Sequence, residues 1–242
     1  MKRIGILGLS NPCSQNRVEQ VVGFLEALEL DVLVSDILTK ESSAKQRADV
    51  FNEYMKMGLD AVFDLSGGDA ANGTLPYLDW EAYQNSATVF HGYSDLTCVL
   101  NPLAQIRPCV LFQIAGNNHR EWITSYLKTG DPSLFETEAL GGNLRCLLKL
   151  AGTPYFPDFK GQDLLLESYS GHWERIDSSL NQLEQMGVFS QIRTLYLGEF
   201  TELDALEQRP LLNQKVRQYG LPVKEVPVGH SPDSKAVWIK RK

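Results

Sequence analysis

The chain has little of what marks a secreted, metal-binding or membrane protein. Only four cysteines occur in 242 residues, and none forms a Cys-x-x-Cys pair. Their scatter argues against a zinc knuckle and a dense disulfide framework, and it favours reduced thiols in a cytoplasmic protein. The apolar run near the N-terminus, Ile4 to Leu9, is too short for the apolar core of a signal peptide. No run approaches the length of a transmembrane helix.

Positive charge is also scarce. The 23 Lys and Arg residues are outnumbered by 30 Asp and Glu, which gives a net charge of −7, and no basic run exceeds Lys240 to Lys242. A nucleic acid or an anionic membrane requires a basic patch on its partner. We therefore expect no nucleic-acid partner and no membrane partner.

Short apolar runs alternate with helical patterns along the first half. Strands are expected at 4–9, 31–34, 61–65 and 88–91, and helices at 18–28 and 41–57, the latter capped by Ser42 or Ser43. Strands that are apolar on both faces and alternate with helices indicate a parallel sheet covered on both sides. The pattern predicts an α/β fold, with a flavodoxin- or Rossmann-like N-terminal sheet and a smaller C-terminal α/β domain.

Asn, Gly and Pro punctuate the middle of the chain, at Asn117-Asn118, Thr129 to Pro132 and Gly141-Gly142. We expect an N-terminal domain over 1–116, a linker over 117–139 and a C-terminal domain over 140–242. The second half shows further elements, with helices expected at 143–150, 173–183 and 211–219, and strands at 163–166, 194–197, 223–226 and 236–239.

The sharpest local motif is Gly92-Tyr93-Ser94-Asp95, which follows a buried strand and opens a helix. This is the geometry of a nucleophile elbow, with the Asp95 N–H placed to donate to an oxyanion. The match is partial, because Leu96 stands where a second glycine belongs. Spacing alone favours the alternative that Ser94 is only a helix N-cap.

A second motif, Gly67-Gly68, follows the third strand and lets the backbone approach a ligand, although an ordinary tight turn explains it equally well. A serine nucleophile needs a base and an orienting acid. His230 follows an apolar strand on a proline-rich loop, whereas His91 lies on a strand facing away from Ser94. Glu167 ends an apolar strand, where α/β proteins gather functional groups.

Motifs in a fixed order along most of the chain resemble the LD-carboxypeptidase (peptidase S66) family, which includes muramoyltetrapeptide carboxypeptidases and microcin C7 self-immunity hydrolases. The matching segments are Gly67-Gly68, Leu75 to Asp79, Gly92 to Thr97, Gly141 to Leu144, Leu150 to Tyr155, Leu164 to Glu167, Arg175 to Asp177, Gly187 to Phe189 and Gly229-His230. No single motif is as specific as this order.

The resemblance implies a serine hydrolase with Ser94 as nucleophile, His230 as general base and Glu167 as its orienting carboxylate. It implies an oxyanion hole made by the Asp95 N–H and one from Gly67 or Gly68, no metal or other cofactor, and a homodimer. The family's usual arginine before the glycine pair is Ser66 here, and its usual Tyr-Gly after the pair is Asp69-Ala70. An arginine suits a substrate carboxylate, so the segments that select the substrate differ from the family pattern.

Three functions stay open at this point. The first is cleavage of an amide beside a D-amino acid in murein tetrapeptides. The second is a self-immunity-type hydrolysis of peptidyl or aminoacyl nucleotides, which an aromatic shelf at the site, from Trp122 or Trp173, would favour. The third is a non-catalytic binding protein on the same fold, against which the presence of Ser94, Glu167 and His230 together argues.

Overall fold

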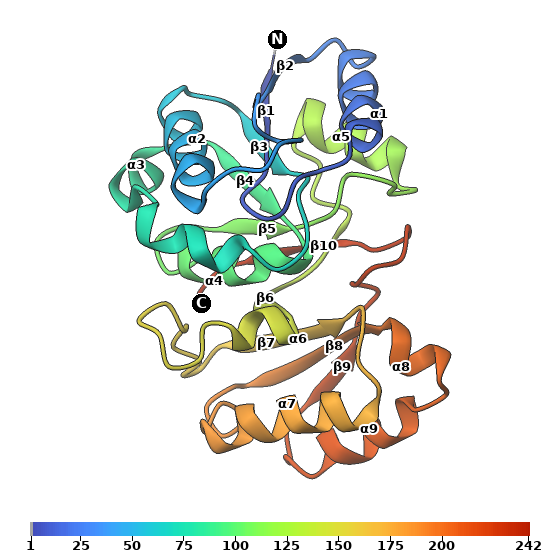
Figure 1. Ribbon diagram of the computed structural model, residues 1–242. Helices are drawn as coiled ribbons and strands as arrows, with labels where there is room; N and C mark the ends of the chain where they lie inside the picture. Colours follow the sequence, from blue (N-terminus) through green and yellow to red (C-terminus); the bar gives the residue numbers. More distant parts are fainter. Residues whose placement is uncertain (1) are drawn as a thin grey trace.

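The computed structural model describes residues 2–242 as a single twisted sheet with helices on both sides (Figure 1). The ten strands lie in the order β2-β1-β3-β4-β5-β10-β6-β7-β8-β9. All neighbours are parallel except β10 and β5, which are antiparallel. The predicted α/β class and parallel sheet are therefore confirmed, and the strands of both halves form one continuous sheet.

The strands follow the apolar runs closely in the first half. Their bounds are β1 Arg3–Leu7, β2 Asp31–Val34, β3 Ala61–Asp64, β4 Val89–Gly92, β5 Cys109–Leu111, β6 Phe135–Asn143, β7 Asp163–Ser168, β8 Thr194–Phe200, β9 Val223–Glu225 and β10 Ala236–Ile239. All four residues of β3 and all six of β7 are buried. Complete burial is what a parallel strand covered on both faces requires.

Helices connect most of the parallel strands. They are α1 Gln15–Glu26, α2 Ala44–Lys56, η1 Ala71–Tyr77, α3 Trp80–Asn85, η2 Ser94–Leu96, α4 Thr97–Leu103, α5 Arg120–Thr129, α6 Leu144–Leu148, α7 Trp173–Gln185, α8 Thr201–Ala205 and α9 Arg209–Arg217, where η1 and η2 are 3-10 helices. Ser43 caps α2 through a reciprocal capping box with Gln46, so the second of the two expected caps is the one used.

The two faces of the sheet bury separate apolar cores. Helices α1 and α5 cover one face of the N-terminal strands, and α2 and α3 lie on the other (Figure 1). Alternate residues of a strand supply alternate cores, as Val62 and Phe63 of β3 do. The core on the α2 face continues without interruption into the second half, where Leu165 and Leu180 belong to it.

The segment 117–139, expected as a linker, contains helix α5 and the first part of β6. Ile123 and Leu127 of α5 are four residues apart and pack on the sheet, which is the spacing of an amphipathic helix. The flanking Asn and Gly residues lie at the two ends of this helix and do not mark a continuous loop. The glycine pair Gly141-Gly142 likewise lies within β6 instead of ending an element.

Strand β10 lies between the two halves of the sheet. It pairs with β5 on one side and with β6 on the other, so the end of the described chain returns to the middle of the molecule (Figure 1). The loop before it, residues 227–235, reaches the carboxyl end of β4. This return places residues from both halves at one edge of the sheet.

Candidate active site

Ser94 lies at the sharp turn between β4 and η2. Its φ of +54° is in the left-handed region, which costs a residue with a side chain about 1–3 kcal/mol. Gly92 makes the turn possible, because a Cβ there would lie 2.7 Å from Cβ of Leu96. The Ser94 hydroxyl caps no helix and contacts His230 instead, so the N-cap alternative is wrong.

Three polar side chains from distant parts of the chain meet at this turn. His230 Nε2 lies 3.2 Å from Ser94 Oγ, and His230 Nδ1 lies 2.9 Å from Glu167 Oε2. The second contact is an ion-pair contact whose angles fall outside those of a hydrogen bond. Glu167 is fully buried, and within residues 2–242 no hydrogen-bond donor is aligned on either of its oxygens. Within the described residues, the polar side chain that contacts this carboxyl group is His230.

Close packing fixes the strand and loop that carry Glu167 and His230. A Cβ on Gly198 of β8 would lie 2.2 Å from the Val228 carbonyl oxygen and 2.9 Å from Cβ of Glu167. Only glycine at this position lets the loop approach β8 so closely, where the Glu199 N–H donates to the Val228 carbonyl at 2.8 Å. Farther along the loop, the Ser231 hydroxyl donates to Glu199 Oε1 at 2.6 Å and the Ser231 N–H to Oε2 at 2.8 Å. His230 is thus held between two anchored segments.

Two tyrosine rings flank the imidazole of His230. The ring centroid of Tyr93 lies 4.6 Å from it and that of Tyr169 lies 4.9 Å from it. The Tyr93 hydroxyl donates to the Gly229 carbonyl, and burial together with nearby Glu167 and Glu199 raises its pKa well above the usual range. Tyr93 therefore stays neutral and positions the loop, whereas Tyr169 is 59% exposed and faces solvent.

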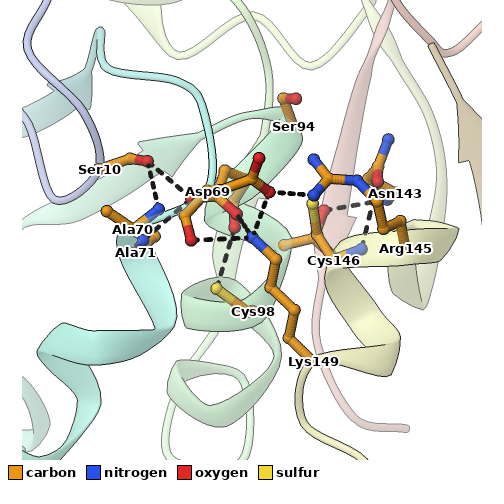
Figure 2. Close-up of polar contacts among 12 residues, drawn as sticks. Ser10, Asp69, Ala70, Ala71, Ser94, Cys98, Asn143, Arg145, Cys146 and Lys149 are labelled. Atoms are coloured by element: carbon orange, nitrogen blue, oxygen red, sulfur yellow. Dashed lines mark hydrogen bonds and ion pairs between the residues drawn. The ribbon is translucent and has the colours of Figure 1, made fainter. Parts of the chain in front are cut away.

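The side chain of Asp95, next to Ser94, lies in a network that joins the two halves. Figure 2 shows its partners Ser10, Ala71 and Lys149. The carboxylate is fully buried; Oδ2 accepts from the Ser10 hydroxyl at 2.6 Å and from the Ala71 N–H at 2.9 Å. Lys149, which follows α6, pairs with Asp95 Oδ1 and with Asp69. Burial lowers the pKa of Lys149, but its hydrogen bonds to Asp95 and Asp69 outweigh burial and raise it. The ammonium therefore stays charged.

The Gly67-Gly68 turn lies against the loop that follows β1. The Asn11 N–H donates to the Gly67 carbonyl at 3.1 Å, and Asn11 Oδ1 accepts from the Asp69 N–H at 2.9 Å. Ser66, which stands where the family has arginine, is buried and donates its hydroxyl to Asp64 Oδ1. The Ser66 side chain is thus directed into the protein and away from a bound substrate.

Asp69, the second departure from the family pattern, is also committed to contacts within the chain. It pairs with Arg145 of α6 and with Lys149, and these hydrogen bonds hold the pKa of its carboxyl below the usual range (Figure 2). Ser66 and Asp69 therefore form contacts within the chain, and neither side chain supplies the positive charge of the family's arginine.

The other histidines have structural partners. His91 is buried on β4, with Nδ1 3.1 Å from the Val62 carbonyl and Nε2 2.8 Å from the Tyr126 hydroxyl. His119 and His172 precede helices α5 and α7. Of the four histidines, His230 alone contacts Ser94.

The cysteines and the possible metal ligands are the other groups that could take part in chemistry. All four cysteines are buried and unpaired. Across residues 2–242, no three His, Cys, Asp or Glu side chains are arranged to hold a metal ion. In the same described range, no helix combines the length and apolar character needed to span a bilayer.

Comparison with known proteins accounts for both halves of the chain. The family model for the LD-carboxypeptidase N-terminal domain matches residues 4–113, and that for the C-terminal domain matches residues 136–242. The chain belongs to the LD-carboxypeptidase family. The resemblance carried by the ordered motifs is confirmed, and with it the assignment to the carboxypeptidase family S66, a serine peptidase family.

Relatives of this LD-carboxypeptidase family member span almost the whole chain. A probable murein peptide carboxypeptidase of Bacillus subtilis is 23% identical over 278 aligned positions, covering 99% of this chain and 87% of its own length. The crystal structure of muramoyltetrapeptide carboxypeptidase from Oxalobacter formigenes superposes with a TM-score of 0.82 at 22% identity, covering 98% of this chain and 92% of its own.

A second branch of the family has the same fold. The microcin C7 self-immunity protein MccF, in a complex with aspartyl sulfamoyl adenosine, superposes with a TM-score of 0.85 at 18% identity. That superposition covers 99% of this chain and 91% of MccF. At these identities the solved structures establish the fold, and the choice between the two branches depends on the site.

The sequence analysis missed several side chains at the site. Tyr169 is two residues beyond Glu167 at the end of β7, a position that strand geometry could have indicated. Arg17 of α1 and Lys149 beyond α6 lie at ordinary helical positions, and only the tertiary structure brings them to the site. The two candidate shelf residues lie elsewhere, Trp122 stacked on Tyr126 and Trp173 at the start of α7.

Proposed function

We propose that Ser94, His230 and Glu167 are the catalytic triad of this LD-carboxypeptidase family member. The observation that carries the proposal is their convergence, with contacts of 3.2 Å and 2.9 Å joining three residues from the turn after β4, the loop before β10 and β7. His230 Nε2 takes the proton of Ser94 as the hydroxyl attacks an amide carbonyl. Glu167 orients the imidazole, with its proton on Nδ1, and stabilises the imidazolium.

The oxyanion is stabilised by backbone donors, the Asp95 N–H and one from Gly67 or Gly68. The position of Asp95 supports this role, since it directly follows the nucleophile and its side chain is held by Ser10, Ala71 and Lys149. Donors fixed before the reaction cost no reorganisation at the transition state. His230 then protonates the leaving amine, and water hydrolyses the acyl-enzyme on Ser94.

The substrate we propose is a murein tetrapeptide, cleaved at the amide next to its terminal D-amino acid. The B. subtilis relative named a probable murein peptide carboxypeptidase and the O. formigenes muramoyltetrapeptide carboxypeptidase support this choice. A protein that recycles such peptides acts in the cytoplasm, which is the location we propose. Division into an N-terminal domain over 1–116 and a C-terminal domain over 140–242, and a homodimer, stay predictions.

Labelling with a fluorophosphonate tests the nucleophile. We expect the wild-type protein to be labelled, and Ser94→Ala to lose the label and all hydrolysis of an L,D-tetrapeptide followed by mass spectrometry. His230→Ala should lower kcat by at least about 10³-fold. The exposed residues Ser178 and His172 provide matched controls, and their alanine variants should behave as wild type. Full activity in Ser94→Ala would refute the triad.

A second function has one observation in its favour. Tyr169 presents an exposed aromatic ring 4.9 Å from the His230 ring, where a base could stack. MccF, whose structure holds aspartyl sulfamoyl adenosine, shares the fold. Incubation with an aminoacyl-sulfamoyl adenosine beside the tetrapeptide separates the two functions. Cleavage of the nucleotide alone would replace the murein assignment.

A further inference from the structure

A cavity of about 280 Å³ opens directly beside His230. Its wall is formed by α1, by the segment after β5 and by the loop that carries His230, and the side chains that matter are Arg17, Gln20, Gln113, Asn117, His230 and Ser231. No acidic side chain lines it, and Arg17 is its permanently charged group. The cavity is therefore a polar compartment suited to an anion.

The position of His230 decides which part of the substrate enters this cavity. In acyl transfer from Ser94, the imidazole that removes the serine proton later donates it to the departing amine. The amine must therefore leave from the His230 side of the scissile bond. Since the cavity lies on that side, it receives the leaving group, and the acyl part extends away from it.

Arg17 is available for a ligand in a way that the other basic residues near the site are not. Asp69 holds both Arg145 and Lys149, whereas Arg17 has no carboxylate partner within residues 2–242. Two neighbours in the cavity wall are already engaged: Gln113 Nε2 donates to the Ala115 carbonyl and Asn117 Nδ2 to the Ser234 carbonyl. Arg17 also lies near the Tyr93 hydroxyl. Its positive charge lowers the pKa of Tyr93, whereas burial raises that pKa more strongly.

We propose that Arg17 binds the free α-carboxylate of the C-terminal amino acid that the enzyme releases, and so determines that the chain acts as a carboxypeptidase. This inference rests on the proposed Ser94 mechanism. The carboxylate is joined to the departing amine through a single carbon, so its distance from His230 is fixed, and a guanidinium can grip it through two parallel hydrogen bonds. Arg17 supplies from α1 the cation that Ser66 does not supply.

Two peptides that differ only at the C-terminus test the role of Arg17. One is the L,D-tetrapeptide with a free carboxylate, and the other is its C-terminal amide. We expect the wild-type protein to favour the acid, and Arg17→Gln to raise KM for the acid at least about tenfold with little change for the amide. Arg17→Lys should recover part of the loss. Arg217→Gln, an exposed arginine on α9, is the matched control.

Binding to Ser94→Ala provides a readout that does not need turnover. Calorimetry should give tighter binding of the acid than of the amide, and Ser94→Ala/Arg17→Gln should bind both equally. Equal binding of acid and amide by Ser94→Ala, or an unchanged preference in the double variant, would overturn the Arg17 proposal. If the preference is present but wild-type protein cleaves neither peptide, the proposed hydrolysis fails while the carboxylate site stands.

Discussion

Asp64 and His91 are buried titratable side chains on the adjacent strands β3 and β4. Burial, assisted by the nearby Asp95, raises the pKa of the Asp64 carboxyl to about 7 against the effect of its hydrogen bonds from Ser66 and the Leu9 N–H. Burial also lowers the pKa of the His91 imidazole to about 4. The two groups affect the free energy of unfolding in opposite senses.

The signs follow from which state binds the proton. Between about pH 4 and 7 the folded state binds the Asp64 proton and the unfolded state does not, so stability from this group falls as pH rises. Between about pH 4 and 6.5 the unfolded state protonates His91 and the folded state does not, so stability from this group rises with pH. In the wild-type protein these two opposite changes of the free energy of unfolding with pH largely cancel.

Asp64→Asn removes the contribution of Asp64 to the pH dependence of the free energy of unfolding and leaves that of His91. We expect the free energy of unfolding of this variant to rise by up to about 3 kcal/mol between pH 4.5 and 6.5, as His91 alone dictates. Urea titrations at each pH, compared with wild type, measure the change. The exposed residue Asp36 is the control, since Asp36→Asn should keep the wild-type profile. A profile for Asp64→Asn parallel to wild type would contradict the prediction.

At the scale of elements, α6 is coupled to the nucleophile turn through Lys149 and Asp95. Lys149→Met would leave the Asp95 carboxylate buried beside only Ser10 and the Ala71 N–H. Removing one partner of a buried ion pair costs about 3–5 kcal/mol. We also expect kcat to fall about tenfold or more with KM nearly unchanged, because the Asp95 N–H is the proposed oxyanion donor. Denaturant titration and steady-state kinetics measure the two effects.

Arg145→Met is the matched control for this coupling. Arg145 pairs with Asp69, whose side chain is 67% exposed, and an exposed pair contributes about 1 kcal/mol or less. Asp95→Asn/Lys149→Met should recover much of the lost stability, since no unpaired charge then remains buried. A Lys149→Met protein as stable and active as wild type would show that α6 does not position the turn.

Elements differ in how well the sequence predicts them. The apolar runs of β1, β3 and β7 are sufficient to predict these strands, because a strand buried on both faces needs little but apolar residues. Strand β6 begins with Phe135-Glu136-Thr137-Glu138 and contains the glycine pair Gly141-Gly142, so its sequence resembles that of a polar turn. Only pairing with β7 and β10 makes it a strand, and that pairing is not encoded locally.

The residues of the candidate site also differ in how well the sequence predicts them. Ser94 follows β4, Glu167 lies near the end of β7 and His230 lies on the loop after β9. All three belong to recognisable motifs, and the sequence therefore indicates them. Arg17 and Lys149 occupy helical positions whose spacing fits any solvated face. Their places near His230 and Asp95 depend on how α1 and α6 pack, which no local pattern records.

At the scale of the whole molecule, β10 joins both halves of the sheet next to the loop that holds His230. Val237 is fully buried and lies opposite Leu111 of β5 and Thr137 of β6. The core on the α2 face is shared by both halves as well. We therefore expect the wild-type protein to unfold in one transition, with backbone amides of β3 and β7 losing hydrogen-exchange protection at the same urea concentration.

Val237→Pro should separate these transitions, because proline removes a backbone donor from the middle of the sheet. Activity should fall further than stability does, since His230 lies on the loop that leads into β10 and its 3.2 Å contact with Ser94, which follows β4, depends on the pairing of β10. Val237→Ala, which keeps the N–H, is the control and should retain one transition at lower stability. Coincident loss of protection in β3 and β7 of Val237→Pro would mean that the shared core alone, without β10, makes the two halves one cooperative unit.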